Sequence, residues 1–476
     1  MNLADPTQRD TVLSRLGRIF TGRRVICGPG PLAGMTDWVT LLDSVGARKP
    51  LLLSTARGAG PVPTEEQASV AWLDADEPGS MTEEARQHDP LLRHLPDRVR
   101  TAVEEYDPER EAVWFTSPFV ADEPIDGRPV YGGRPRAWMS LEDKLVADRI
   151  WDAVGAPRAD RRVVPVEPSA LRQAHAALDE GFGTVWAGDA RDGLNGGGDF
   201  VRWVRDEADA QAAVDFFAER CDRVRVMPFL EGVPCSIHGM VLPDGTAAFR
   251  PLELAILRGP RRRFVYGGQG TTWDAPAEDR AWMRELVRRA GEHLRAEAGY
   301  RGGFGIDGVL TAHGFRPTEL NPRMSGGLTS LARAVDWPLF CLLQLNLVAG
   351  RDPGVSADEL EAWAVPLMDE RTFCKAIVVS TAATVDEARD IPVAWDGHRL
   401  RRARGTTARA SVVIGPTSMG VFAKLVTPAP PERGSRAAEV NVALMGLLDE
   451  VAGTDFGEVS AAPDVRREAL VGEPAP

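Results

Sequence analysis

Three residues in the second half of the chain have side chains suited to binding a hard cation. Asp307 lies in the apolar stretch "FGIDGVL", and Glu319 and Asn321 follow in "RPTELNPR", twelve and fourteen residues later. The turn-like "TAHG" between them predicts a hairpin that closes near Gly314. Because residues two apart on a strand share a face, this hairpin would bring Asp307 opposite the other two side chains. Such a patch suits Mg2+ that keeps some waters and takes phosphate oxygens as further ligands, although an ordinary polar hairpin face has the same pattern.

A glycine-rich run and one arginine add phosphate chemistry to this pattern. Four glycines fall among the six residues from Gly193 to Gly198, between two predicted strands. Such a backbone can approach a phosphate closely and can move as a lid, although a flexible hairpin tip has the same composition. Arg301 precedes Asp307 by six residues on the same predicted strand. There it would stabilise charge on a transferring phosphoryl group, and a solvated surface arginine is the alternative.

Two more segments are candidates for holding an anionic substrate. "NPRMSGGLTS" supplies Arg323 and a Ser325–Gly326 turn that opens a helix, and a helix N-terminus can bind a carboxylate. "RGPRRRFVYGGQG" concentrates four arginines, which predicts either an anion-binding loop or an ordinary solvated charge run. These four are Arg258, Arg261, Arg262 and Arg263.

Several elements are needed to position these side chains. "RRVICGPGPLAGMTDWVTLLDSVGARKPLLLSTARG" has the order strand, turn, helix, strand, which predicts a βαβ unit and a parallel sheet. Its "CGPGPLAG" turn lacks the GxGxxG spacing, so a tight turn into a helix is expected there rather than a phosphate site. "SLEDKLVADRIWDAVGAPR" predicts an amphipathic helix with a serine cap. Further predicted elements are strands in "TVWAGDA", "DFVRWV" and "RVRVMPFL", a meander with a turn at Asp244–Gly245, a helix ending at Gly299, and, after residue 350, three strands and a helix over 435–452.

Length, charge and cysteine usage limit the class of protein. The 476 residues exceed the usual size of one core, so two to four domains are expected. The net charge of −13 argues against a nucleic acid or an anionic membrane as the main partner. Five scattered cysteines form no CxxC pair, the N-terminus lacks a signal-peptide core, and the apolar run 339–350 is too short to span a membrane. A cytoplasmic location is therefore expected.

The order of these segments resembles the ATP-grasp superfamily. Lys144 opens a helix, a two-strand unit with a glycine-rich loop follows, then the hinge "RVMPFLEG", and finally "RGGFGID" and "TELNPR". The resemblance covers roughly residues 136–350 and implies an α/β architecture in which two α+β subdomains enclose ATP. It implies an N-terminal βαβ domain over 1–135, an ATP-grasp domain over 136–350 with its small subdomain at about 150–225, and a C-terminal α+β domain over 351–476. The layout looks most like the pheganomycin-type peptide ligases.

The resemblance also assigns roles by position. It implies that Asp307 and Asn321 each hold one Mg2+ and that Glu319 bridges both. It makes Arg301 the arginine that stabilises the transition state, and Lys144 a phosphate-contacting lysine. The remaining implied ligands of the nucleotide are the loop glycines Gly196, Gly197 and Gly198 and the hinge residues Met227, Phe229, Leu230 and Glu231. The implied substrate ligands are Arg258, Arg323, Ser325 and Gly326.

Two departures from the family pattern bear on the nucleotide site. The family has a second lysine in the strand before the glycine-rich loop, and Ala187 occupies that region here. Arg191 and Arg202 are candidates to supply the missing charge. The family also favours a carboxylate shortly after the hinge to hold the ribose, and Glu231 is the nearest one because the later position is Cys235.

We therefore expect an ATP- and Mg2+-dependent ligase that joins a small-molecule carboxylate to an amine through an acyl phosphate. Natural-product assembly is the expected setting, and a homodimer is compatible with it. Ligation to a thiol and a kinase-like use of the same site are rivals among enzymes. A degenerate ATP-grasp module that acts as a scaffold or sensor is the rival from another class, and Ala187 favours it.

Overall fold

The N-terminal part of the chain forms a parallel α/β unit, as the βαβ pattern predicts. The computed structural model describes residues 2–74, 78–191, 193, 196, 198–260, 263–396, 399–427 and 431–472. Five strands pair in parallel in the order β3 (Ser69–Trp72), β2 (Leu51–Ser54), β1 (Val25–Gly30), β4 (Val113–Phe115) and β5 (Val130–Tyr131). The accompanying helices are α1 (Pro6–Gly17), α2 (Leu32–Ser44), α3 (Met81–Arg93), α4 (Asp97–Tyr106) and α5 (Arg136–Met139). All six residues of β1 are buried, as expected for a parallel strand covered on both faces.

The turn after β1 is a tight entry into α2, as expected from its missing GxGxxG spacing. The amide of Leu32 donates to the Ala56 carbonyl, and that of Ala33 donates to the Arg57 carbonyl. Because these amides already have partners within the chain, they do not form a phosphate cradle.

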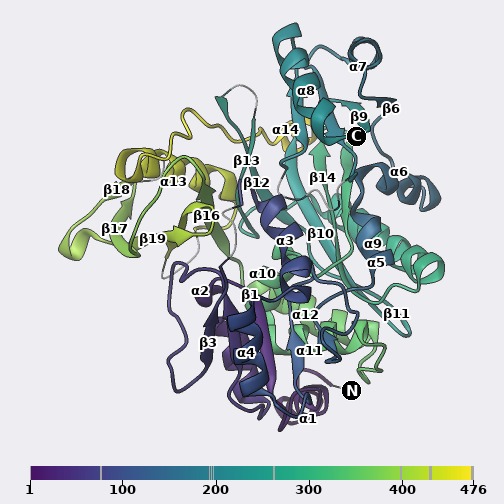
Figure 1. The fold of residues 1–476 in the computed structure, drawn as a ribbon. Helices are drawn as coiled ribbons and strands as arrows, with labels where there is room; N and C mark the ends of the chain where they lie inside the picture. Colours follow the sequence, from purple (N-terminus) through teal and green to yellow (C-terminus); the bar gives the residue numbers. More distant parts are fainter. Residues whose placement is uncertain are drawn as a thin grey trace.

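A smaller antiparallel sheet follows, at the upper right of Figure 1. Its order is β6 (Arg162–Pro165), β9 (Arg223–Pro228), β7 (Thr184–Gly188) and β8 (Val201–Val204). Helices α7 (Pro168–Leu178) and α8 (Glu207–Arg220) pack on it around a core that includes Leu171, Trp186 and Phe217. Helix α6 (Lys144–Ala153) precedes this unit and packs against the large sheet.

The remaining strands form one large antiparallel sheet that crosses the predicted boundary at residue 350. β13 pairs with β16, with Gln269 opposite Lys375. The strands run in the order β15 (Gly314–Asn321), β14 (Gly302–Thr311), β10 (Val233–Leu242), β12 (Leu252–Arg258), β13 (Phe264–Gly270), β16 (Cys374–Ser380), β20 (Gly420–Val426), β19 (Ala410–Thr417), β17 (Arg389–Trp395) and β18 (Leu400–Arg402), while β11 (Gly245–Ala248) pairs with β10. The domain boundaries themselves stay predictions.

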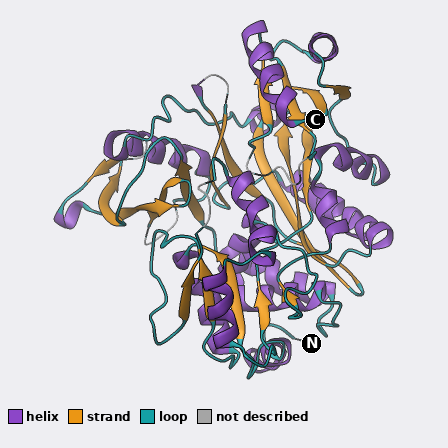
Figure 2. Ribbon diagram, in the orientation of Figure 1, coloured by secondary structure: helices purple, strands orange, loops and turns teal. Residues whose placement is uncertain are grey.

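Helices cover this sheet and connect it to the N-terminal unit (Figure 2). They are α9 (Ala277–Ala298), α10 (Gly326–Val335), α11 (Trp337–Val348), α12 (Ala357–Glu370), α13 (Ala437–Ala452) and α14 (Val465–Gly472). α9 ends at Gly299 in a left-handed conformation, with φ of +60°, as its sequence predicts. The apolar run at 339–350 belongs to α11, where Leu342 and Leu343 are fully buried. Among the described helices none is long and apolar enough to cross a membrane.

Candidate active site

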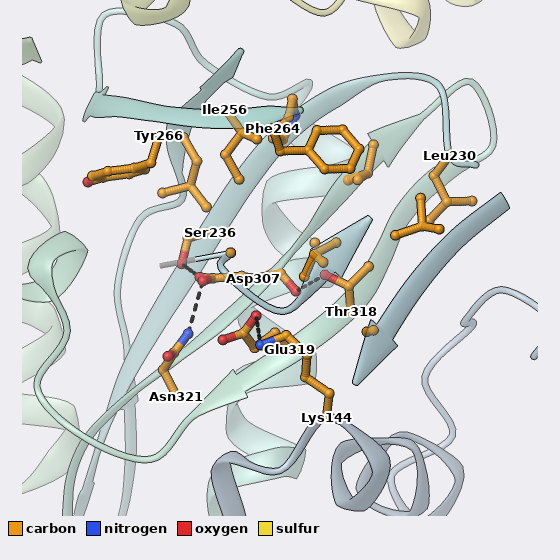
Figure 3. A pocket seen from close by; sticks show the side chains of 18 of the residues that line it. Lys144, Leu230, Ser236, Ile256, Phe264, Tyr266, Asp307, Thr318, Glu319 and Asn321 are labelled. Atoms are coloured by element: carbon orange, nitrogen blue, oxygen red, sulfur yellow. Dashed lines mark hydrogen bonds and ion pairs between the residues drawn. The ribbon is translucent and has the colours of Figure 1, made fainter. Parts of the chain in front are cut away.

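The predicted hairpin forms and brings Asp307, Glu319 and Asn321 together. β14 and β15 pair with Asp307 opposite Glu319 and with Thr311 opposite Gly314 at the turn. Asp307 Oδ2 accepts a hydrogen bond from Asn321 Nδ2 at 2.9 Å, and Oδ1 accepts one from Ser236 Oγ at 2.5 Å. Figure 3 shows these side chains facing one cavity. The arrangement therefore differs from a solvated hairpin face.

The electrostatics of this patch favour a cation. Burial, and then the charge of Glu319, raise the pKa of Asp307 to about 6. A cation beside the two carboxylates would offset both effects. Among the described residues no group of three or more His, Cys, Asp and Glu could hold a metal alone. Two carboxylates and one amide instead fit Mg2+ that draws its other ligands from phosphate and water.

Lys144 lies at the base of the same cavity. It is the first residue of α6, and its side chain is only 5% exposed. Its Nζ lies 3.1 Å from Glu319 Oε2 (Figure 3). The predicted serine cap is wrong, because Asp143 caps the helix and Ser140 lies one turn earlier in a 3-10 turn, Ser140–Glu142. The cap shift leaves Lys144 at the helix start, as predicted.

A buried arginine that the sequence did not single out stands opposite Ala187. Arg225 on β9 is the cross-strand partner of Ala187 on β7, and both line the cavity. Arg225 is 3% exposed and donates to the carbonyls of Lys144 at 2.9 Å and Thr318 at 3.0 Å. Beside Ala187, its Nη1 also pairs with the buried Asp148, 3.2 Å from Oδ1. The signal available was the alternating "RVRV", whose register with Ala187 the sequence does not give.

The two arginines predicted for that role lie elsewhere. Arg191 donates to the Glu219 carbonyl and lies 3.6 Å from an oxygen of Asp222. The guanidinium of Arg202 stacks 3.7 Å from the ring centroid of Phe216. Neither residue lines the cavity. Both candidates are therefore wrong, because their guanidinium groups are taken up on the outer side of the small sheet.

Arg323 lies in the cavity wall and is held from two sides. Its Nε donates to Glu142 Oε1 at 2.5 Å, and its Nη2 donates to Asn321 Oδ1 at 2.9 Å. Glu142 also accepts from Arg134 at 2.6 Å. Although burial opposes ionisation, the charges of Arg323 and Arg134 hold the pKa of Glu142 below its usual value. Arg323 is thus a fixed cation beside the metal patch.

The start of α10 and a buried histidine complete this end of the cavity. Ser325 caps α10 by accepting from the Leu328 amide at 3.3 Å, and Ser325 and Gly326 both line the cavity. His238 lines it as well, with Nε2 3.2 Å from Ser236 Oγ. Burial and, after it, Arg323 lower the pKa of His238 to about 3. This histidine is therefore neutral at pH 7.

The hinge forms the other end of the cavity, whose volume is about 410 Å3. Met227, Phe229 and Leu230 line it, and Phe229 stacks on Trp203 with ring centroids 4.2 Å apart. Figure 3 shows Leu230 across the cavity from Tyr266. Such an apolar, aromatic wall suits a planar base.

Glu231 and Arg258 pair with each other at this hinge. Arg258 donates to both carboxylate oxygens of Glu231, with Nη1 3.2 Å from Oε2. The Arg258 guanidinium lies 5.1 Å from the ring centroid of Phe229. This contact places Arg258 with the hinge, so its role in holding a substrate stays a prediction. Glu231 does not line the cavity, and Arg261 and Arg262 lie outside the described residues.

The described part of the glycine-rich loop lies over the cavity. Gly196 and Gly198 line it, whereas Gly197 falls outside the described residues. Thr82 Oγ1 on α3 donates to the Gly196 carbonyl at 2.9 Å and accepts from its amide at 3.1 Å. The Thr82 amide also donates to Asp199 Oδ2 at 3.2 Å. The N-terminal unit therefore holds this loop, a contact that the sequence did not predict.

The prediction for Arg301 is wrong. It precedes β14, is exposed, and is absent from the cavity wall. Six residues at about 3.3 Å each place its Cα about 20 Å from that of Asp307. Its guanidinium lies beside Gly350 instead, where an added Cβ would meet Nη1 at 2.8 Å. An extended strand carried this arginine away from the patch.

Solved structures share this fold, although no protein-family model and no curated protein matches the sequence. The biotin carboxylase domain of the 2-oxoglutarate carboxylase from Hydrogenobacter thermophilus, solved with MgADP and bicarbonate, is 14% identical, with 94% of each chain covered and a TM-score of 0.54. Phosphoribosylamine–glycine ligase from Thermotoga maritima is 15% identical, with 87% of this chain and 95% of that chain covered and a TM-score of 0.52. The chain has the ATP-grasp fold.

A third solved structure has the same fold. Carboxyaminoimidazole ribonucleotide synthase from Aspergillus clavatus, solved with ATP, is 12% identical, with 90% of this chain and 99% of that chain covered and a TM-score of 0.50. In the present chain β7, β8 and β9 of the small sheet and β10, β12, β13, β14 and β15 of the large sheet contribute to the cavity wall. Lys144, Arg225, Asp307, Glu319 and Asn321 therefore share one cavity that is lined by strands of both sheets.

Proposed function

We propose that this chain is an ATP-dependent, ADP-forming ligase that joins a carboxylate to an amine. The observation that carries the proposal is the set of Asp307, Glu319 and Asn321 facing one cavity with Lys144 and Arg323. Carboxylate and amide oxygens opposite fixed cations suit Mg2+ and the terminal phosphates of ATP. The likeness to enzymes solved with MgADP and with ATP supports the same cofactors here.

The two ends of the cavity would bind different parts of the nucleotide. The hinge residues Met227, Phe229 and Leu230 would hold the base, while Gly196 and Gly198 would cover the phosphates. Mg2+ held by Asp307, Glu319 and Asn321 would neutralise phosphate charge. Lys144 Nζ lies 3.1 Å from Glu319 Oε2. A cation bound at Glu319 would replace the ammonium group there, and this group could then contact a phosphate oxygen. Arg225 would add the charge that Ala187 lacks.

The reaction proceeds in two displacements. A carboxylate oxygen attacks the terminal phosphorus, and the bond to the ADP oxygen breaks, which gives an acyl phosphate. The amine nitrogen then attacks the acyl carbon, and phosphate leaves from the tetrahedral intermediate as the nitrogen loses its proton. Arg323, fixed by Glu142 and Asn321, is placed to neutralise the carboxylate and the phosphoryl group. No protein nucleophile takes part.

The finer assignment is a peptide or amide ligase acting on an amino acid or small peptide in natural-product assembly. The pheganomycin-type order of segments supports this assignment. We place the protein in the cytoplasm. A nucleotide-binding scaffold without ligase activity is the second candidate. Ala187 supports it, whereas the presence of Arg225 opposite Ala187 weakens that support.

A screen of ADP release tests the proposal. Amino acids and small acids are offered with ATP and Mg2+, with and without amines, and hydroxylamine is added to trap the acyl phosphate as a hydroxamate. We expect at least one acid to stimulate ADP release and to yield its hydroxamate. AMP as the nucleotide product would overturn the mechanism. Measurable ATP binding without stimulation by any acid would favour the scaffold.

A further inference from the structure

A second cavity of about 810 Å3 lies beside the first and is not used by the mechanism above. Its wall comes from the turn that enters α2, from α10, and from β16 and β20. Figure 1 shows these elements meeting where the N-terminal unit faces the C-terminal strands. The cavity is large enough for a small metabolite.

Positive charge dominates this second cavity. Four cationic side chains line it, and its one acidic residue, Asp37, is paired with Arg333. The cations are Arg333, Arg371, Lys375 and Lys424. A positive cavity in a chain of net charge −13 implies a local function, because the overall field is negative.

Two of these cations have no partner among the described residues, and one of them, Lys424, is exposed. In the segments that the structure describes, the ammonium groups of Lys375 and Lys424 form neither an ion pair nor a hydrogen bond. The cross-strand partner of Lys424 is Ile377, two residues along β16 from Lys375, so the two lysines share one face of the sheet. Burial, and then the charges of Arg333 and Lys424, lower the pKa of Lys375 to about 8. An anion bound between the two lysines would offset the burial and the charge repulsion that oppose protonation of Lys375.

Gln269 connects the linings of the two cavities. Gln269, which lines the first cavity, is the cross-strand partner of Lys375, which lines the second. Gln269 Nε2 donates to Ser330 Oγ at 2.7 Å and to the Gly326 carbonyl at 2.6 Å. Ser330 faces the second cavity, and Gly326 faces the first. The two cavities are therefore neighbours on either side of these contacts.

We propose that the second cavity binds the anionic group, a carboxylate or a phosphate, of a small molecule. Lys375 and Lys424 are its ligands, and Arg371 adds to the field. This site goes beyond the proposed ligase function, because it lies outside the cavity proposed for ATP.

Calorimetry with simple anions tests the site on the full chain. Inorganic phosphate and succinate are titrated into the wild type and into a Lys375→Met, Lys424→Met double variant, and the two probes distinguish phosphate from carboxylate preference. We expect one probe to bind the wild type and to bind the double variant at least about tenfold more weakly. Lys49→Met is the matched control, because Lys49 is exposed and lies outside both cavities. An ATP analogue should bind all three proteins equally.

Amine labelling gives a second measurement that needs no variant. The chain has lysines only at positions 49, 144, 375 and 424, so peptide mapping resolves each one. We expect Lys375 to react near pH 8 and the bound anion to protect it, while Lys49 reacts equally with and without the anion. Absence of binding by either probe, equal binding by the double variant, or no protection of Lys375 would overturn the inference. If the double variant loses anion binding but no acid stimulates ADP release by the wild type, the anion site is supported and the ligase function is rejected.

Discussion

Glu319 is the residue at which the proposed cation site and the proposed phosphate site meet. Its carboxylate faces Asp307 across the hairpin and lies 3.1 Å from the Lys144 ammonium group. Glu319→Gln keeps the volume and a hydrogen-bond acceptor for Lys144 but removes the charge that would hold a cation. We expect ligase turnover to fall by at least about a hundredfold, equivalent to about 3 kcal/mol of barrier. Steady-state ADP release measures this.

A matched substitution separates chemistry from general effects. Glu297 is an exposed residue on α9, away from the cavity, and Glu297→Gln should leave turnover unchanged. Thermal unfolding of the Glu319 variant without ligand should stay close to wild type, since glutamine still accepts from Lys144. Near-normal turnover in Glu319→Gln would remove the assignment of this patch to metal binding.

Arg323 and Arg301 give opposite expectations for the same substitution. Arg323 is buried, bound to Glu142 and Asn321, and lines the cavity, whereas Arg301 is exposed at the far end of β14. Lysine lacks the planar fork that makes both of Arg323's contacts. Arg323→Lys should therefore lower kcat/KM by about tenfold or more, and Arg301→Lys should stay within about twofold. A larger loss of kcat/KM in Arg301→Lys would indicate that Arg301 has a catalytic role.

At the scale of elements, the sequence predicts a local hairpin but does not predict the register between strands that are distant in the chain. The β14–β15 hairpin could be predicted because turn residues and a two-residue period fix a short antiparallel pair, and Asp307 meets Glu319 as expected. Ser236 opposite Asp307 and Arg225 opposite Ala187 could not, because those pairings join strands that are far apart in the chain. Arg301 lies outside the cavity because six residues of extended strand separate it from Asp307.

Helix α3 makes an interelement contact that carries a prediction of its own. Thr82 exchanges two hydrogen bonds with Gly196, and this holds the glycine-rich loop over the cavity. Thr82→Val keeps the shape and removes both bonds, each with a net stabilisation of about 1 kcal/mol. We expect the KM for ATP to rise several-fold and amide exchange around Gly198 to accelerate.

Hydrogen exchange followed by mass spectrometry checks the loop directly. Thr101→Val is the control, because Thr101 is exposed on α4 and bonds only the Asp97 carbonyl of its own helix. ATP and Mg2+ should slow exchange in the loop of the wild type more than in Thr82→Val. Equal exchange in all three proteins, with and without nucleotide, would mean that the loop is a simple hairpin tip.

At the scale of the whole molecule, the sheet runs unbroken across the predicted boundary at residue 350. β13 pairs with β16, and Ala255 and Leu257 of β12 share a core with Leu444 and Leu448 of α13. Glu253 is fully buried and accepts from Arg436 Nε and from the Ala437 amide, both at 2.6 Å. The C-terminal quarter of the chain therefore supplies both pairing and charge compensation to the strands that line the site.

Removal of residues 351–476 should unfold the site in the part that remains. A fragment of residues 1–350 would expose the β13 edge and the apolar face of β12, and it would leave Glu253 buried without Arg436. We expect the full chain to bind an ATP analogue, and we expect β13 and β16 to unfold together in one calorimetric transition. The fragment should show no cooperative transition and no nucleotide binding. The sharper variant Glu253→Gln, in the full chain, should lower the free energy of unfolding by about 1–3 kcal/mol, because it weakens a buried charge-assisted contact. A fragment that folds cooperatively and binds the analogue as tightly as the full chain would show that the C-terminal part is an independent domain after all.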